Sequence, residues 1–186
     1  ESVLIPESDR LTLCVSSQVG CSLNCSFCAT GAMGFTRNLS TSEIIDQFCI
    51  MKKQTCGASR ITNVVFMGMG EPLLNLRSVI RAAEILIDQK AFGLPPRRVT
   101  VSTAGVVPKI LELVEKVPVN LAVSLHAARD KLRNELVPLN RKYPIAELFK
   151  TLKKIPKLSR RHPIFFEYTL LAGVNDSKRD ARDLVE

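Results

Sequence analysis

The sequence predicts an α/β fold in which a mostly parallel sheet is built from repeated strand, turn and helix units. Five short runs rich in β-branched and aromatic residues alternate with segments whose apolar residues recur at helical spacing. Unusual polar residues follow these runs, as they do at the carboxyl edge of parallel sheets. No linker divides the 186 residues, so we expect one domain over 1–186. Right-handed crossovers between parallel strands fit an open α/β layer or part of a barrel.

The first half of the chain contains two of these units. Leu11-Thr-Leu-Cys-Val15 is expected to be a strand, and the capping box Ser40-Thr-Ser-Glu43 opens a helix over about residues 41–54. A second buried strand is expected over 62–67. It is followed by a helical stripe from Leu76 to Leu86 that ends before Gly93 and two prolines.

The second half repeats the pattern. Strands are expected over 98–102, 120–124 and 164–171, and the segment after residue 126 is polar. One helix carries Pro108 in its first turn, and another runs from Ile145 to Leu152 between Pro144 and Pro156. The last residues, 183–186, also have a helical pattern, and the chain begins without Met, so we expect a fragment of a longer protein.

Three cysteines lie together in the loop after the first strand, with the spacing Cys21-x3-Cys25-x2-Cys28. Four thiolates usually hold a zinc ion or an iron–sulfur cube, and no further Cys or His follows before Cys49. A [4Fe-4S] cluster held here would keep one iron open for a substrate. Phe27 places an aromatic ring beside that iron, where an adenine could stack. This spacing resembles the radical S-adenosylmethionine (SAM) superfamily.

The alternative interpretation is a structural zinc site completed by His126 or Cys14, although zinc sites prefer paired ligands. Six cysteines with three in one loop do not resemble a secreted disulfide framework, and a low-potential cluster needs a reducing compartment. With no apolar run of membrane-spanning length, we expect a soluble domain and no membrane partner.

Basic charge is concentrated in the second half of the chain. Residues 97–186 hold 18 basic and 10 acidic side chains, whereas residues 1–96 hold 8 of each. The segment from Arg141 to Arg161 alone has eight basic residues against Glu147. This segment is either a phosphate-binding face or a solvated helix rim.

Polar residues at the strand ends form a second group of candidates. Gly70 and Glu71 follow the second strand, where glycine lets the backbone approach a ligand and the carboxylate could accept from an ammonium group. Ser102 and Ser124 end the next two strands and could bond a ribose or carboxylate, or cap helices. His126 lies at the same edge, whereas His162 is interpreted as surface, Cys49 as core and Cys56 as unrelated to the site. Cys14 is either a core residue or part of the site.

Several longer motifs resemble the RlmN/Cfr family of radical SAM RNA methyltransferases, and together they cover most of the chain. They are Glu1-Ser-Val, the run from Thr12 to Cys21, Gly34 to Leu39, Asn63 to Asn75, Arg98 to Gly105 and Ser124 to Ala127. The resemblance implies a six-fold (β/α) barrel, incomplete here, and methylation of carbon 2 of adenine in 23S-type ribosomal RNA and in tRNA. It also implies two cofactors, a [4Fe-4S] cluster and S-adenosyl-L-methionine.

In this family one SAM methylates a cysteine. A second SAM yields a deoxyadenosyl radical that takes a hydrogen from the new methyl group, and the carbon radical adds to the adenine. By motif, the resemblance implies that the cluster ligands are Cys21, Cys25 and Cys28. It implies that SAM is contacted by Phe27, Gly70, Glu71, Ser102, Ser124, Leu125 and His126. Cys14 corresponds to the thiol that resolves the protein–RNA adduct, and Glu1 to the proton acceptor.

The methyl-carrying cysteine, a further SAM-contacting asparagine and the amino-terminal RNA-binding domain of the family are not found in this sequence, so we expect the chain alone to be inactive. Expected partners are ribosomal RNA, tRNA and an electron donor such as flavodoxin or ferredoxin. We expect a monomer in the cytoplasm, or in an organelle matrix if the source is eukaryotic. The alternatives are a radical SAM enzyme for a protein or metabolite, and a non-catalytic, metal-stabilised RNA-binding module.

Overall fold

The computed structural model describes residues 1–55, 60–155 and 163–185, and its centre is a six-stranded sheet. The strand order is β1-β2-β5-β6-β7-β8, and every neighbouring pair is parallel except the antiparallel pair β1–β2. The strands are β1 (Ser2–Pro6), β2 (Leu11–Val15), β5 (Asn63–Phe66), β6 (Val99–Thr103), β7 (Asn120–Ser124) and β8 (Ile164–Glu167). The predicted α/β fold with a mostly parallel sheet is confirmed, and the barrel is not closed.

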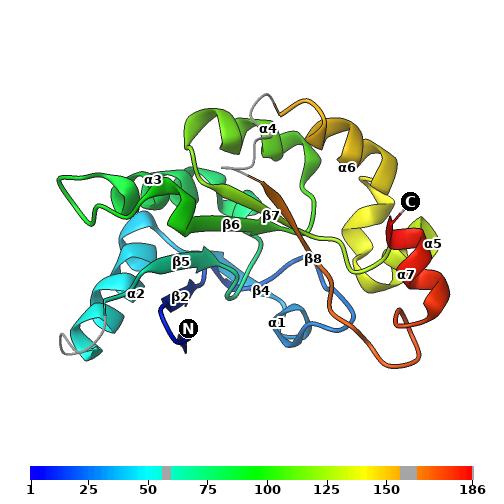
Figure 1. Ribbon diagram of the computed structural model, residues 1–186, viewed down its shortest axis with the longest axis horizontal. Helices are drawn as coiled ribbons and strands as arrows, with labels where there is room; N and C mark the ends of the chain where they lie inside the picture. Colours follow the sequence, from blue (N-terminus) through cyan, green and yellow to red (C-terminus); the bar gives the residue numbers. More distant parts are fainter. Residues whose placement is uncertain (56–59, 156–162, 186) are drawn as a thin grey trace.

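The long helices cover one side of the sheet, with α3, α4 and α6 along the top of Figure 1. The helices are α1 (Ala29–Ala32), α2 (Thr41–Gln54), α3 (Leu76–Ile87), α4 (Val107–Lys116), α5 (Asp130–Leu136), α6 (Ile145–Leu152) and α7 (Lys178–Val185). Short 3-10 turns η1 (Pro72–Asn75), η2 (Pro96–Arg98) and η3 (Pro138–Arg141) join them. A second sheet pairs β3 (Gln18–Gly20) with β4 (Phe35–Asn38) on either side of the cysteine loop.

The strands have two different faces because side chains alternate along a strand. On β2, Leu11, Leu13 and Val15 are buried in the main apolar core together with Ile44 and Phe48 of α2. Thr12 and Cys14 lie on the other face and are only partly buried. The sheet therefore keeps its apolar face for the helices and leaves the inner face available for a ligand.

Helix α2 begins where the sequence predicts. The Glu43 backbone N–H donates to the Ser40 hydroxyl at 3.2 Å, and the Ser40 N–H donates to the Glu43 carboxylate at 2.8 Å. These two bonds satisfy backbone donors that the first turn of a helix would otherwise leave open. Arg37 adds an ion pair to the Glu43 carboxylate at 2.7 Å, which ties β4 to the start of α2.

Several elements differ from the prediction. Strand β1 and the β3–β4 pair were not expected, and α5 occupies a segment that was expected only to be polar. Strand β8 ends at Glu167 rather than at residue 171, because the Glu167 carbonyl accepts from the backbone N–H groups of Leu125 and His126 as β7 ends. The interpretations made for Cys56 and His162 fall outside the described residues.

Among the described residues, no helix is both long enough and apolar enough to cross a lipid bilayer.

Candidate functional site

The cysteine loop runs from β3 to α1 and is held at both ends and in its middle. The Cys21 N–H donates to the Gly34 carbonyl at 2.9 Å, and the Cys28 N–H donates to the Cys25 carbonyl at 3.0 Å. The Ser26 N–H donates to the carbonyl of Leu136 at the end of α5, also at 3.0 Å. The loop is thus fixed to a helix more than a hundred residues further along the chain.

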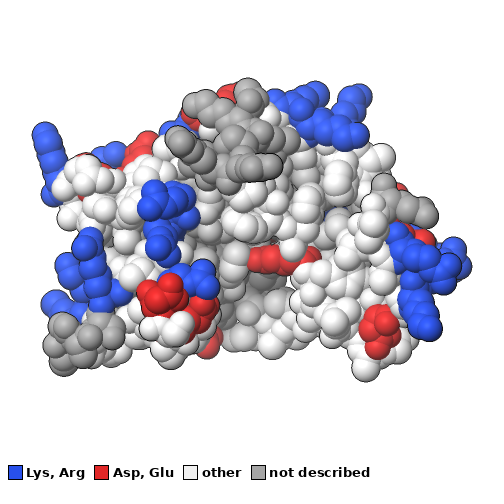
Figure 2. All heavy atoms as spheres, in the orientation of Figure 1, with Lys and Arg blue, Asp and Glu red and all other residues white. Residues whose placement is uncertain are grey.

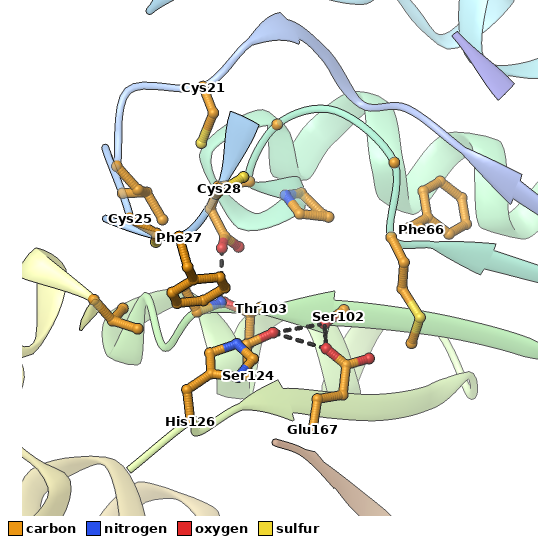
Figure 3. Close-up of a pocket in the computed structure, with 18 residues that line it drawn as sticks. Cys21, Cys25, Phe27, Cys28, Phe66, Ser102, Thr103, Ser124, His126 and Glu167 are labelled. Carbon is orange, nitrogen blue, oxygen red and sulfur yellow. Dashed lines mark hydrogen bonds between the residues drawn. The ribbon is translucent and has the colours of Figure 1, made fainter. Parts of the chain in front are cut away.

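The three thiols of this loop share one cavity with residues from the carboxyl ends of β5, β6, β7 and β8 (Figure 3). The cavity is open to solvent, and its free volume of about 620 Å³ includes part of that open space. Of the predicted site residues it is lined by Cys21, Cys25, Phe27, Cys28, Gly70, Glu71, Ser102, Ser124 and His126. Leu125, Cys14 and Glu1 do not line it.

Glu71 is a buried carboxylate in this cavity, only 3% exposed. Its Oε1 accepts from the Leu73 N–H at 3.0 Å, and its Oε2 accepts from the Ala104 N–H at 2.8 Å. Burial raises the pKa of the Glu71 carboxyl, and these backbone hydrogen bonds oppose the shift. Because each carboxylate oxygen can accept more than one bond, Glu71 retains capacity for a ligand donor such as an ammonium group.

The glycines before Glu71 are needed for packing within the chain. A Cβ on Gly70, whose φ is +96°, would lie 2.4 Å from the Cβ of Gln18, and one on Gly68 would lie 2.7 Å from the Ser16 hydroxyl. Packing against Gln18 is therefore enough to explain why residue 70 is a glycine, without the approach of a ligand. The backbone of Gly70 does line the cavity.

Glu167 was missed by sequence reasoning, and it organises one wall of the cavity. The hydroxyls of Ser102 and Ser124 donate to its Oε2 at 3.0 and 2.8 Å (Figure 3). Because each serine has only one hydroxyl proton, both serines can offer a ligand only acceptor oxygens while these bonds last. The wall therefore suits a ligand that donates, such as a sugar hydroxyl. The signal in the sequence was a charged residue within an aromatic strand.

His126 follows Ser124 by two residues, and its ring lies edge-on to Phe27, at 4.7 Å between ring centroids. Its Nδ1 accepts from the Thr169 N–H at 3.1 Å, which places the proton of the neutral ring on Nε2. Burial, with a smaller contribution from the positive charge of Arg133, lowers the pKa of His126 to about 4. The neutral ring is thus a donor at Nε2.

Acid should destabilise the chain through His126. Below its ordinary pKa of 6.5 the unfolded chain takes up a proton that the native chain accepts only near pH 4, so native stability falls as pH drops through this window. The shift corresponds to roughly 3 kcal/mol at most. We expect His126→Asn to remove this component, because Asn tolerates the local φ of +58° and keeps an acceptor for Thr169.

Urea unfolding midpoints of both proteins at pH 7.5 and pH 5 measure the effect. Equal losses of stability in the wild type and in His126→Asn would contradict this assignment.

Cys14 lies on the partly buried face of β2, and Glu1 directly precedes β1. Cys14 pairs with Val3 across β1 and β2, and the Ser16 hydroxyl donates to the Glu1 carbonyl at 2.5 Å. Burial raises the pKa of the Cys14 thiol, and the negative charges of Glu1 and Glu167 raise it further. Cys14 is only partly buried and is not among the residues of the main core, and the charges of both carboxylates act on its thiol.

The three thiols fit an iron–sulfur cluster better than a single metal ion. All five described cysteines are free, and burial raises the pKa of the Cys21 and Cys25 thiols, in the case of Cys25 to about 12. No three Cys, His, Asp or Glu side chains in the described part of the chain are close enough together to hold one ion. A cluster, in which each cysteine binds a different iron, matches this wider spacing. Among the described residues, neither His126 nor Cys14 comes together with the three cysteines in an arrangement that could hold a single ion.

On the face shown in Figure 2, basic side chains lie mainly at the left, the upper right and the right, and acidic atoms are visible in the hollow near the centre. Of the basic segment, the described residues Arg141, Lys142, Lys150, Lys153 and Lys154 are all exposed. Lys157, Arg160 and Arg161 lie outside the described residues.

Comparison with known proteins agrees with this geometry. The family model of the Radical SAM superfamily matches residues 15–185. The dual-specificity RNA methyltransferase RlmN of Marinomonas sp. (strain MWYL1) is 56% identical over 195 residues, which cover 100% of this chain and 52% of that protein. The dual-specificity RNA methyltransferase RlmN of Syntrophobacter fumaroxidans is 53% identical over 186 residues, which cover 100% of this chain and 54% of that protein. The chain thus spans about half the length of the curated relatives it matches.

The crystal structure of a radical SAM methyltransferase from Sphaerobacter thermophilus superposes with a TM-score of 0.90 at 46% identity, covering 98% of this chain and 54% of that one. The resemblance to the RlmN/Cfr family noted from the motifs is confirmed by these relatives. The family match over almost the whole chain, together with three thiols facing strand-end polar residues in one cavity, shows that the chain belongs to the radical SAM superfamily.

Proposed function

We propose that this chain is the radical SAM core of an enzyme that methylates carbon 2 of adenine in 23S-type ribosomal RNA and in tRNA. One observation carries the proposal: three thiols from a single loop share a cavity with Glu71, Ser102, Ser124 and His126. The name of the matched relatives, dual-specificity RNA methyltransferase, supports the substrate class.

Cys21, Cys25 and Cys28 would hold the [4Fe-4S] cluster. When bound, the cluster supplies an iron that is not held by cysteine, to which SAM can bind, and the electron that cleaves the sulfonium. The protein must deprotonate the three thiols, and because burial raises the pKa of Cys21 and Cys25, loading releases protons.

The remaining cavity residues would bind and orient SAM according to what each can donate or accept. Glu71 would accept from the SAM ammonium, and the Ser102, Ser124 and Glu167 wall would accept from the ribose hydroxyls. His126 would donate from Nε2, and Phe27 would contribute an aromatic face. Leu125 is buried, and its backbone N–H and C=O are bonded to Glu167 and Arg133, so its role would be to shape the turn.

Cys14 and Glu1 would act at the later steps of the family's reaction. We place Cys14 as the thiol that resolves the covalent adduct with RNA, and Glu1 as the proton acceptor. The proposal is supported by the pairing of Cys14 with Val3, by the bond from the Ser16 hydroxyl to the Glu1 carbonyl, and by the Glu1 charge acting on Cys14. We expect the methyl-carrying cysteine and the amino-terminal RNA-binding domain in the half of the relatives that this chain does not span. The chain alone should therefore not methylate RNA.

The exposed basic segment would contact RNA phosphates. A low-potential donor such as flavodoxin or ferredoxin would reduce the cluster. The free cysteines suit the reducing environment of a cytoplasm or an organelle matrix. The protein is proposed to act as a monomer.

The test is the electron paramagnetic resonance (EPR) spectrum of the anaerobically reconstituted, dithionite-reduced chain, with and without SAM. We expect a [4Fe-4S]⁺ signal that changes when SAM is added. Zinc in place of iron, or a signal indifferent to SAM, would favour the metal-stabilised RNA-binding module. In the whole protein, RNA binding that is unchanged after charge reversal of Lys150, Lys153 and Lys154 would favour a protein or metabolite substrate.

A further inference from the structure

Arg133 on α5 is a charged side chain buried beside the candidate site, and the proposed function does not use it. It is 1% exposed. Its Nε donates to the Leu125 carbonyl at 2.9 Å, and its Nη2 donates to the carbonyls of Ala104 and Ser124 at 2.8 and 3.0 Å. Its Nη1 donates to Asn140 Oδ1 at 2.7 Å. The guanidinium thus joins the turns that end β6 and β7.

All four of these acceptors are neutral. In the part of the chain that the structure describes, Arg133 makes no ion pair. The carboxylate of Asp130 is linked to it only through Asn140, whose Nδ2 donates to Asp130 Oδ1 at 2.8 Å. A buried charge without a directly paired counterion is costly, and such charges in proteins are usually paired. The surroundings of Arg133 therefore leave its positive charge largely uncompensated.

The cysteine loop is the neighbour on which this charge acts. The loop is bonded to α5 through the Ser26 N–H and the Leu136 carbonyl, and the side chains of Cys25 and Phe27 pack against the small apolar cluster around Val137. The guanidinium is also bonded to the carbonyls of Ala104 and Ser124, and both residues line the cavity of the three thiols. Arg133 therefore lies against one wall of that cavity.

We propose that Arg133 is the counter-cation of the iron–sulfur cluster, a positioning residue whose buried positive charge favours the one-electron reduction of a cluster held by Cys25 and its two partners. The inference rests on the proposed function. A cluster bound by three thiolates is anionic, and a reducing electron adds to its negative charge. A fixed cation in a low-dielectric interior stabilises the reduced form more than the oxidised form, and net charge is one of the features that set cluster potentials.

The same residue would couple reduction to SAM binding through the backbone. The Ala104 peptide that accepts from Arg133 at its carbonyl donates at its N–H to Glu71. The Ser124 and Leu125 carbonyls lie directly before His126. One side chain therefore fixes the turns that would hold SAM and provides the charge opposite the cluster.

The test is a reductive titration of the reconstituted protein, with dithionite as the one-electron donor and the EPR signal as readout. Arg133→Gln removes the charge, and we expect its midpoint potential to become more negative. At the wild-type midpoint the ratio of reduced to oxidised cluster should fall about tenfold, equivalent to about 59 mV for one electron. Arg133→Lys keeps the charge but loses the forked hydrogen bonds, and should stay close to the wild type in potential.

A second variant leaves Arg133 in place and is expected to change the midpoint potential in the opposite direction. Asp130→Asn keeps an oxygen for the Asn140 amide but removes the negative charge nearest to Arg133 along this network, so the potential should become less negative. Arg77→Gln, at an exposed arginine on α3, is the matched control and should leave the potential unchanged.

The outcomes separate the two proposals. If the wild type forms a SAM-responsive cluster, and Arg133→Gln, Arg133→Lys and Asp130→Asn all keep the wild-type potential, Arg133 is only a structural clamp and the inference is wrong. If the wild-type protein holds no cluster, the proposed function fails, and this inference fails with it. If Arg133→Gln does not fold, the midpoint potential of Asp130→Asn decides. A less negative potential supports the inference, and an unchanged or more negative one contradicts it.

Discussion

Replacing Cys25 by alanine is expected to abolish the SAM-responsive EPR signal and, in the whole protein, RNA methylation. Cys25 lies in the middle of the loop, is partly buried, and lines the cavity together with Cys21 and Cys28. With one of three thiolates lost, the cluster has too few ligands to be retained. The loss of activity should exceed the 10–100-fold or so that changes around a metal site typically cause.

Cys49→Ala is the matched control, because Cys49 is also a free, partly buried cysteine but lies on α2, away from the cavity. We expect it to retain the iron content and spectrum of the wild type, as should Cys14→Ala, since Cys14 does not line the cavity. A Cys25→Ala protein that still carries a SAM-responsive cluster would contradict the ligand assignment.

Glu71→Gln is expected to have the second largest effect, on both SAM affinity and stability. Both carboxylate oxygens accept backbone N–H groups, so an amide must turn its NH₂ toward one of those donors inside the cavity. Leaving a buried donor unpaired costs about 1–3 kcal/mol. The negative charge for an ammonium group is lost as well, and we expect the affinity for SAM to fall at least about 100-fold, the scale of 2.7 kcal/mol.

Glu115→Gln on the exposed side of α4 is the control and should change neither quantity by a measurable amount. Isothermal titration of SAM into the reconstituted protein gives the affinity, and urea unfolding gives the stability. If Glu71→Gln binds SAM as the wild type does, Glu71 holds only the turn of the chain and not the ligand.

The fold could be predicted where local chemistry alone decides it. Helix α2 has the predicted bounds because the capping bonds of Ser40 and Glu43 are encoded within four residues. Strand β1 could not be predicted, because Ser2–Pro6 becomes a strand only by pairing with β2. Helix α5 was missed because Arg133, its most buried residue, is charged. The pattern that locates helices counts such a residue as exposed.

In the candidate site, too, some features could be predicted from the sequence, and others depend on contacts between distant segments. The three cysteines and the residues at the strand ends could be predicted to meet, because parallel strands bring their carboxyl ends to one edge. The role of Glu167 could not, since it depends on β8 lying next to β7, with Ser124 opposite it in register. The glycines before Glu71 were assigned to ligand approach because the sequence does not show that Gln18 fills the space beside Gly70.

The order of the strands also determines how the chain should behave when it is concentrated. Within the described residues, β1 and β8 each have a strand neighbour on one side only, so each presents a row of backbone N–H and C=O groups that another copy could pair with. Val3 and Ile5 on β1 and Phe165 on β8 are all more than 40% exposed. These apolar side chains favour association between copies of the chain at the two edges. Intermolecular β-pairing at these two strands is therefore the expected route of aggregation, and a charged residue at Ile5 or Phe165 is the substitution that should suppress it.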